Sequence, residues 1–128
     1  MNRTILLFGV FFGISAVLLG AFGAHGLKEL ISDSSLDSYK TAVNYQMYHA
    51  LLLLWLGSTS KIAEPGKKWI FWCLLLGVIL FSFSIYLLAT SSLHSINLEG
   101  IAFITPLGGA ILITAWFLLG YRIFKYFN

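Results

Sequence analysis

Four long apolar stretches dominate the pattern of hydrophobic and polar positions. Charged residues separate uncharged blocks at 4–27, 41–60, 69–98 and 100–121. A helix needs about 20 apolar residues to cross the hydrocarbon core of a bilayer, so each block can cross once. Two crossings by the third block would need about 40 residues, more than it has. The pattern predicts an all-α membrane protein, a compact bundle of four transmembrane helices forming a single domain with spans near 4–25, 38–60, 68–90 and 99–122.

The first block is predicted to be a retained helix. Met1, Asn2 and Arg3 resemble the basic start of a signal peptide, but the apolar part of a signal peptide normally has about 7–15 residues, and this block is longer. Phe22 stands two residues before Ala24, where a cleavage site requires a small side chain.

The segment after the first block predicts a short interfacial helix. Residues 27–31 place apolar side chains at helical i, i+3, i+4 spacing. Ser34 followed by Asp37 resembles a capping box, which marks the start of a helix. We therefore expect a short amphipathic helix at about 27–33 and a second long helix that begins near residue 36.

Composition supports the membrane class. The chain has 59% apolar and only 10% charged residues, and its mean hydropathy is +0.87. A soluble domain is about 25% charged, so that class is excluded, and the hydrophobicity is too high for disorder. Cys73 is the single cysteine, so the chain can form neither an intrachain disulfide nor a multi-cysteine metal site.

The distribution of cations predicts the orientation. If the N-terminus is cytoplasmic, six of the eight Lys and Arg residues collect on the inner side, namely Arg3, Lys61, Lys67, Lys68, Arg122 and Lys125. Lys28 and Lys40 then lie outside. Because cytoplasmic loops carry the excess of Lys and Arg, we expect a multi-pass protein of the cell (inner or plasma) membrane with both termini cytoplasmic. The lipid bilayer is the expected partner, and the scattered cations predict no nucleic-acid binding.

Small residues recur along one face of the first block, and two more stand together in the fourth. Small side chains let helices approach closely in lipid. Contact with helices of the same chain is the favoured interpretation, and self-association into a homo-oligomer is the alternative. The predicted helix-packing residues are Gly9, Gly13, Ala16, Gly20, Gly23, Ala24, Gly108 and Gly109.

Polar residues inside the blocks lie at similar depth on the predicted outer side. Such residues are costly in hydrocarbon, so their shared depth suggests that they act together. They form a candidate polar cluster of His25, Tyr45, Gln46, Tyr48, His49, Ser82, Ser84, Tyr86, Glu99 and Thr105. We predict that His25 and His49 approach each other, with Glu99 or Tyr86 within hydrogen-bonding range.

Three interpretations of this cluster compete. A structural hydrogen-bond network is favoured, because buried polar groups in lipid must find partners. The second is a site for a small ligand, a lipid headgroup or a proton. The third is a metal site at His25, His49 and Glu99, whose residue types suit a metal. No HxxxH or HExxH pattern supports the third, so neither a metal nor a cofactor is predicted.

Pro106 predicts a kink in the fourth helix. Proline has no N–H, so the carbonyl of Ala102 loses its usual helical donor. Thr105 or a neighbouring helix is expected to satisfy that carbonyl.

Several of these segments together resemble a known family. Residues 20–27 read GAFGAHGL, residues 45–51 read YQMYHAL, and residues 104–109 read ITPLGG. They resemble the domain-of-unknown-function 423 family, which includes bacterial inner-membrane proteins of the YgdD and YwdK type and is similar to the eukaryotic small transmembrane protein 256. The resemblance covers nearly the whole chain. It implies a four-helix membrane protein without an established activity, and its recurring residues fall on the candidate polar cluster.

The sequence contains no catalytic signature. P-loop, GxSxG, HExxH, CxxC and dinucleotide fingerprints are absent, and no two of the five carboxylates share a membrane block. We therefore predict a non-enzymatic structural component of the membrane, or one that associates with a membrane-protein partner. The alternative is a small transporter, or a lipid-, ion- or small-ligand-binding protein, that uses the candidate polar cluster.

Overall fold

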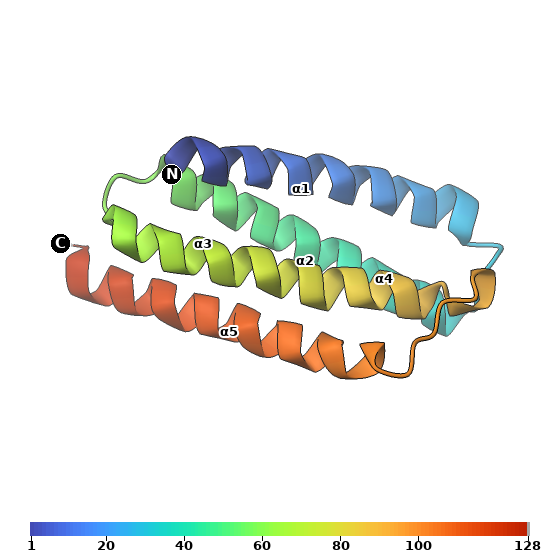
Figure 1. Cartoon of the computed structure of the whole chain (residues 1–128). Helices are drawn as coiled ribbons and strands as arrows, with labels where there is room; N and C mark the ends of the chain where they lie inside the picture. The colour runs from blue at the N-terminus through green and yellow to red at the C-terminus, as the bar shows by residue number, and fades with distance from the viewer. Residues whose placement is uncertain (128) are drawn as a thin grey trace.

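Helices make up almost all of residues 1–127, the part of the chain that the computed structural model describes, and no strand occurs among these residues. Four long helical segments run side by side (Figure 1). The third is continuous although its hydrogen bonding changes within it. In chain order the elements are α1 (Asn2–Phe22), η1 (Gly23–Leu27), α2 (Asp33–Ser58), α3 (Glu64–Val78), η2 (Ile79–Phe83), α4 (Ser84–Ala89), η3 (Ser91–Leu93) and α5 (Ile101–Tyr126).

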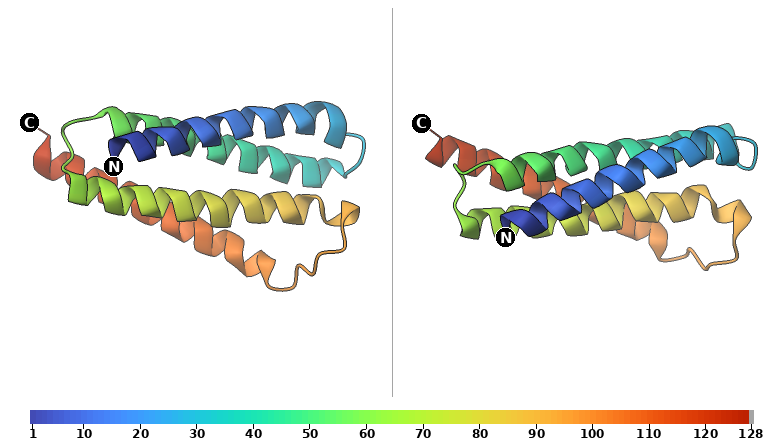
Figure 2. Two further views of the ribbon diagram at one scale, coloured as in Figure 1. Left: turned by 45° about the horizontal axis from the view of Figure 1, so that its top comes forward. Right: turned by 90° about the horizontal axis from the view of Figure 1, so that it is seen from above.

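Successive segments run in opposite directions, so the two ends of the chain lie at the same end of the bundle (Figure 1). α1 packs chiefly on α2, and α5 packs chiefly on α3. The N-terminal end of α5 diverges from α4, which leaves the bundle wider at the end opposite the termini (Figure 2).

Three of the segments are long and apolar enough to span a membrane: Asn2–Leu27, Glu64–Ala89 and Ile101–Tyr126. α2 is also 26 residues long but less apolar. It joins the end of α1 to the start of α3, which lie at opposite ends of the bundle (Figure 1), so it covers the same distance. Large apolar side chains face outward, including Phe103, Phe117 and Phe124, which are 79%, 74% and 90% exposed. This is an all-α membrane bundle, as predicted.

The predicted short helix at 27–33 is wrong. α1 continues through the π-helical turn η1 to Leu27, residues 28–30 form a turn, and α2 already begins at Asp33. The cap is Ser32, whose side-chain oxygen accepts a hydrogen bond from the N–H of Ser35 at 3.2 Å. Leu27 is fully buried, because it packs against Tyr39 instead of lying on the membrane surface.

Glycines allow the closest contacts between helices. Gly9 lies against Leu54 and the carbonyl of Ala50, and Gly23 lies against the ring of Tyr39. A Cβ atom at Gly20 would lie 3.3 Å from Val43, and Ala16 is buried. Most of the small face of α1 is therefore turned toward α2, within the same chain.

Two residues of the predicted packing set on the first helical segment, α1 with η1, do not pack in this way. A Cβ atom at Gly13 would meet nothing within 4 Å, and Ala24 is exposed. Ala24 lies in the π-helical turn η1, where the changed hydrogen bonding rotates the chain away from the regular α-helical face.

The closest approach involves α5 and η2. A Cβ atom at Gly108 would lie 2.4 Å from the backbone nitrogen of Phe81, whereas one at Gly109 would meet nothing closer than 3.7 Å. Only a glycine at position 108 lets these two backbones touch.

Candidate functional site

Gln46 is the centre of the buried polar groups. Its side chain is fully buried on α2. The amide nitrogen Nε2 donates to the carbonyl of Phe12 at 2.9 Å and to Oγ of Ser15 at 2.7 Å, both on α1. Its oxygen Oε1 accepts from the phenol of Tyr86 on α4 at 2.7 Å. One side chain thus joins three helical segments through both of its polar atoms.

Serine hydroxyls make two further links. Ser82, which is fully buried in η2, donates to the carbonyl of Ala42 on α2 at 2.8 Å. Ser84 on α4 lies 2.6 Å from the hydroxyl of Thr105 on α5 and donates to the carbonyl of Phe81 at 2.9 Å. Thr105 therefore binds Ser84 and does not make the predicted bond to Ala102. Together with Gln46, these groups connect all four long segments.

His49 is held in its neutral form by its partners. The indole Nε1–H of Trp116 on α5 donates to Nε2 of His49 at 3.1 Å. An indole nitrogen only donates, so Nε2 must be the acceptor and Nδ1 must carry the proton. Nδ1 then donates to the carbonyl of Tyr45, 2.6 Å away. The ring is a fixed link between α2 and α5.

The predicted approach of His25 to His49 is wrong. His25 is exposed in η1, near the level where Gly23 meets Tyr39. His49 lies ten residues beyond Tyr39 on the same helix, a separation of about 15 Å at 1.5 Å per residue. Because α1 and α2 run in opposite directions, the two histidines cannot meet.

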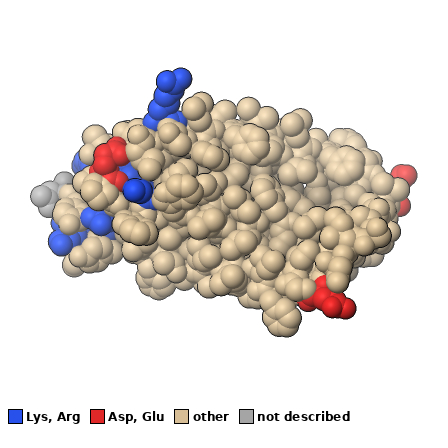
Figure 3. Space-filling view, viewed as in Figure 1, with Lys and Arg blue, Asp and Glu red and all other residues tan. Residues whose placement is uncertain are grey.

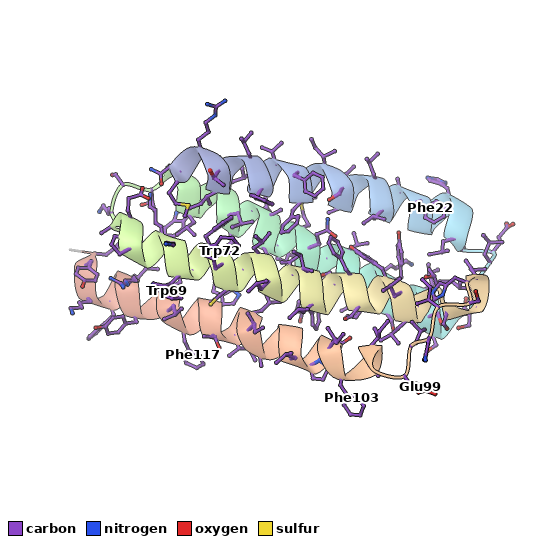
Figure 4. All side chains as sticks on the ribbon, viewed as in Figure 1. Phe22, Trp69, Trp72, Glu99, Phe103 and Phe117 are labelled. Atoms are coloured by element: carbon purple, nitrogen blue, oxygen red, sulfur yellow. The ribbon has the colours of Figure 1, made fainter. Side chains whose placement is uncertain are left out.

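Glu99 and Tyr48 also lie outside the buried network. Glu99 stands in the loop before α5, and its side chain points away from the bundle (Figure 4). Tyr48 is 56% exposed, on the outer face of α2. Tyr45 takes part through its backbone carbonyl, while its ring packs on Phe81 with a centroid distance of 4.9 Å.

Three residues of the network were missed from the sequence. Ser15 accepts from Gln46, and Trp116 donates to His49. Tyr39 is 2% exposed and donates to the carbonyl of Leu19 at 2.6 Å. All three lie within or beside the apolar blocks, and this position was the only indication of their burial in the sequence. An aromatic ring or a lone serine at such a position is equally compatible with contact to lipid.

A second polar contact lies at the end of the bundle that holds the termini. Lys67 is 1% exposed, and its ammonium donates to Oδ1 of Asn2 at 2.9 Å and to the carbonyl of Thr59, the C-cap of α2. A cation suits this place, because the end of a helix carries unpaired carbonyls and partial negative charge. Lys67 thus ties the start of α3 to the start of α1 and the end of α2.

The network contains only neutral hydrogen-bonding groups. Every buried side-chain nitrogen and oxygen atom among the described residues has a hydrogen-bond partner. Within residues 1–127, no three His, Cys, Asp or Glu side chains come together in a way that could hold a metal ion. His25, His49 and Glu99 therefore do not form a ligand set. The arrangement holds helices together through mutually satisfied polar atoms.

Comparison with known proteins places the chain in a family. Residues 19–109 match the family described as "Protein of unknown function (DUF423)". A "UPF0382 membrane protein" of Staphylococcus haemolyticus is 37% identical over 97% of this chain and 98% of its own length. Another, from Staphylococcus saprophyticus, is 37% identical over 96% and 98%. A third, from Staphylococcus aureus, is 36% identical over 97% and 98%. No solved structure matches. The chain belongs to the DUF423 family of membrane proteins.

Proposed function

We propose that this protein is a non-catalytic component of the cell membrane whose central polar residues serve to hold its four helices in one arrangement. The proposal rests on Gln46 of α2, whose side chain links three helical segments. Its nitrogen donates to α1, and its oxygen accepts from α4. A ligand or proton site needs polar groups that remain available, whereas these are already bonded to one another.

The outer surface supports a role within the bilayer. Leu7, Phe11 and Leu18 on α1 are 59%, 59% and 65% exposed. These bulky apolar side chains suit contact with lipid tails or with an apolar face of another membrane protein. Most of the small face of α1 is already covered by α2, so a partner would chiefly meet the bulky face.

We further propose that all four segments cross the membrane and that both termini are cytoplasmic. The argument rests on charge. On the face drawn in Figure 3, the Lys and Arg atoms in view gather at the end of the bundle that holds the termini, where acidic atoms also lie, whereas only acidic atoms are coloured at the opposite end. An excess of cations on one side of a multi-pass protein is typical of the cytoplasmic side.

The test is native mass spectrometry of the purified protein in detergent, combined with thermal unfolding of a Gln46→Leu variant. The proposal predicts a lower unfolding midpoint for the variant, and no stoichiometric species whose retention depends on Gln46. A bound molecule that is released by Gln46→Leu while the bundle remains folded would contradict it.

A further inference from the structure

At the end of the bundle opposite the termini, α5 diverges from α4 (Figure 2). A cleft lies there between α2, α4 and α5. It has a volume of about 480 Å³, within the range of small-molecule sites. The first turns of α2, the end of α4 and the start of α5 form its walls. Five of the lining residues carry hydroxyls: Ser34, Ser35, Ser38, Thr41 and Thr105.

Two of these hydroxyls have no hydrogen-bond partner among residues 1–127. Thr41 donates to the carbonyl of Asp37, Ser35 bonds Ser32, and Thr105 bonds Ser84. Among residues 1–127, no hydrogen bond involves the hydroxyl of Ser34 or Ser38. Both side chains are exposed on the cleft and able to donate and accept.

The opposite wall offers a backbone acceptor. Ala102 and Pro106 both line the cleft. Pro106 has no N–H, so the carbonyl of Ala102 lacks its i→i+4 helical donor, and the hydroxyl of Thr105 is bonded to Ser84. A ligand hydroxyl that enters the cleft can supply the donor that this carbonyl lacks.

The remaining lining is apolar and uncharged. Ile85, Leu88 and Pro106 supply much of it, and no Lys, Arg, Asp or Glu belongs to the lining. An anionic headgroup would find no cation among these lining residues. An uncharged headgroup that donates and accepts hydrogen bonds matches the hydroxyl-bearing part of the lining, and an apolar body joined to it matches the apolar part.

We propose that this cleft binds a lipid with an uncharged, hydroxyl-bearing headgroup, the chemical class of glycosyl-diacylglycerols. The headgroup hydroxyls bond Ser34, Ser38 and the carbonyl of Ala102, and the acyl chains leave along Ile85 and Leu88. The proposal is independent of the buried network around Gln46, which it leaves intact.

The test uses the full chain in lauryldimethylamine oxide, a detergent without hydroxyls that would compete. Monoglucosyl-diacylglycerol is titrated, and retained lipid is counted by native mass spectrometry. We expect a 1:1 complex that phosphatidylcholine does not form at the same concentration. Ser34→Ala/Ser38→Ala removes two neutral hydrogen bonds and should weaken binding by at least about tenfold. Ala102→Trp, which fills the cleft, should abolish it.

Ser58→Ala/Ser60→Ala, at and just beyond the far end of α2, is the matched control and should bind as the parent does. Unfolding midpoints of all variants establish that they are folded. The proposal is overturned if the cleft variants bind like the control, or if phosphatidylcholine is retained equally. Equal retention of phosphatidylglycerol would assign an anionic headgroup instead. Equal binding of free methyl glucoside would assign a soluble sugar.

Discussion

The side chains of Gln46 and Tyr86 are joined by a 2.7 Å hydrogen bond between α2 and α4. Because the amide of Gln46 also donates to Phe12 and Ser15 on α1, this bond completes a link across three helical segments. In lipid the hydrophobic effect gives helices little reason to associate, so packing and hydrogen bonds of this kind must specify the arrangement. The pair is therefore central to the structural interpretation of the polar residues.

Gly108 and Gly109 differ in what an added methyl group would meet. Gly108→Ala would press a Cβ atom against the backbone of Phe81, which cannot move aside easily, and should destabilise the protein by about 1–3 kcal/mol. Gly109→Ala has room and should be nearly neutral. Unfolding in detergent with increasing dodecyl sulfate measures both. Equal losses would show that α5 does not approach η2 as described.

Lys67 and Lys68 are adjacent cations in opposite surroundings. Lys67→Met removes the ammonium that bonds Asn2 and the carbonyl of Thr59, and should lower the free energy of unfolding by about 2 kcal/mol. Lys68 is exposed, so Lys68→Met should change it by no more than about 0.5 kcal/mol. The same unfolding assay compares them. An unchanged free energy of unfolding for Lys67→Met would show that these bonds of Lys67 do not stabilise the bundle.

His49 and His25 provide a second matched pair. His49→Ala leaves the indole N–H of Trp116 without its acceptor and should cost about 1–3 kcal/mol. His25→Ala, at an exposed position, should be within about 0.5 kcal/mol of the parent. Tryptophan fluorescence should shift only in the first variant. If His25→Ala proved equally destabilising, His25 would have a contact that the structure does not contain.

The proposed orientation predicts which end of the bundle is accessible from outside the cell. In a Cys73→Ala background, Ser35→Cys should react with an impermeant thiol reagent in intact cells, and Glu64→Cys should react only after the membrane is permeabilised. Both positions lie at helix starts, at opposite ends of the bundle. Labelling of Glu64→Cys alone would reverse the orientation.

The long apolar blocks located the four helical segments, because a crossing of fixed length needs a run of apolar residues whatever its neighbours are. The depth of a polar residue could be estimated in the same way. The side of the helix on which that residue lies could not be estimated from the sequence. Gln46 and His49 are three residues apart and turn inward, whereas Tyr48, between them in sequence, turns to the outside. Depth alone therefore grouped inward and outward residues together.

Lys67 and Ser32 show a second limit. A lysine that flanks an apolar block normally lies in water, so nothing in the sequence distinguishes Lys67 from Lys68. Its burial depends on Asn2, which is 65 residues away, and on Thr59, at the end of the preceding helix. Ser32 and Ser34 are both suitable N-cap residues for α2. Because Leu27 packs against Tyr39, the turn between η1 and α2 is short, and α2 begins after Ser32.

The most direct test of the structural interpretation is a double-mutant cycle on Gln46 and Tyr86. Gln46→Leu, Tyr86→Phe and the double variant are compared by their free energies of unfolding in detergent. Asn44→Leu, at an exposed position on α2, replaces Gln46→Leu in the control cycle. A coupling of about 0.5–1.5 kcal/mol between Gln46 and Tyr86, and none between Asn44 and Tyr86, is expected. Single variants as stable as the parent, with no coupling, would contradict the account.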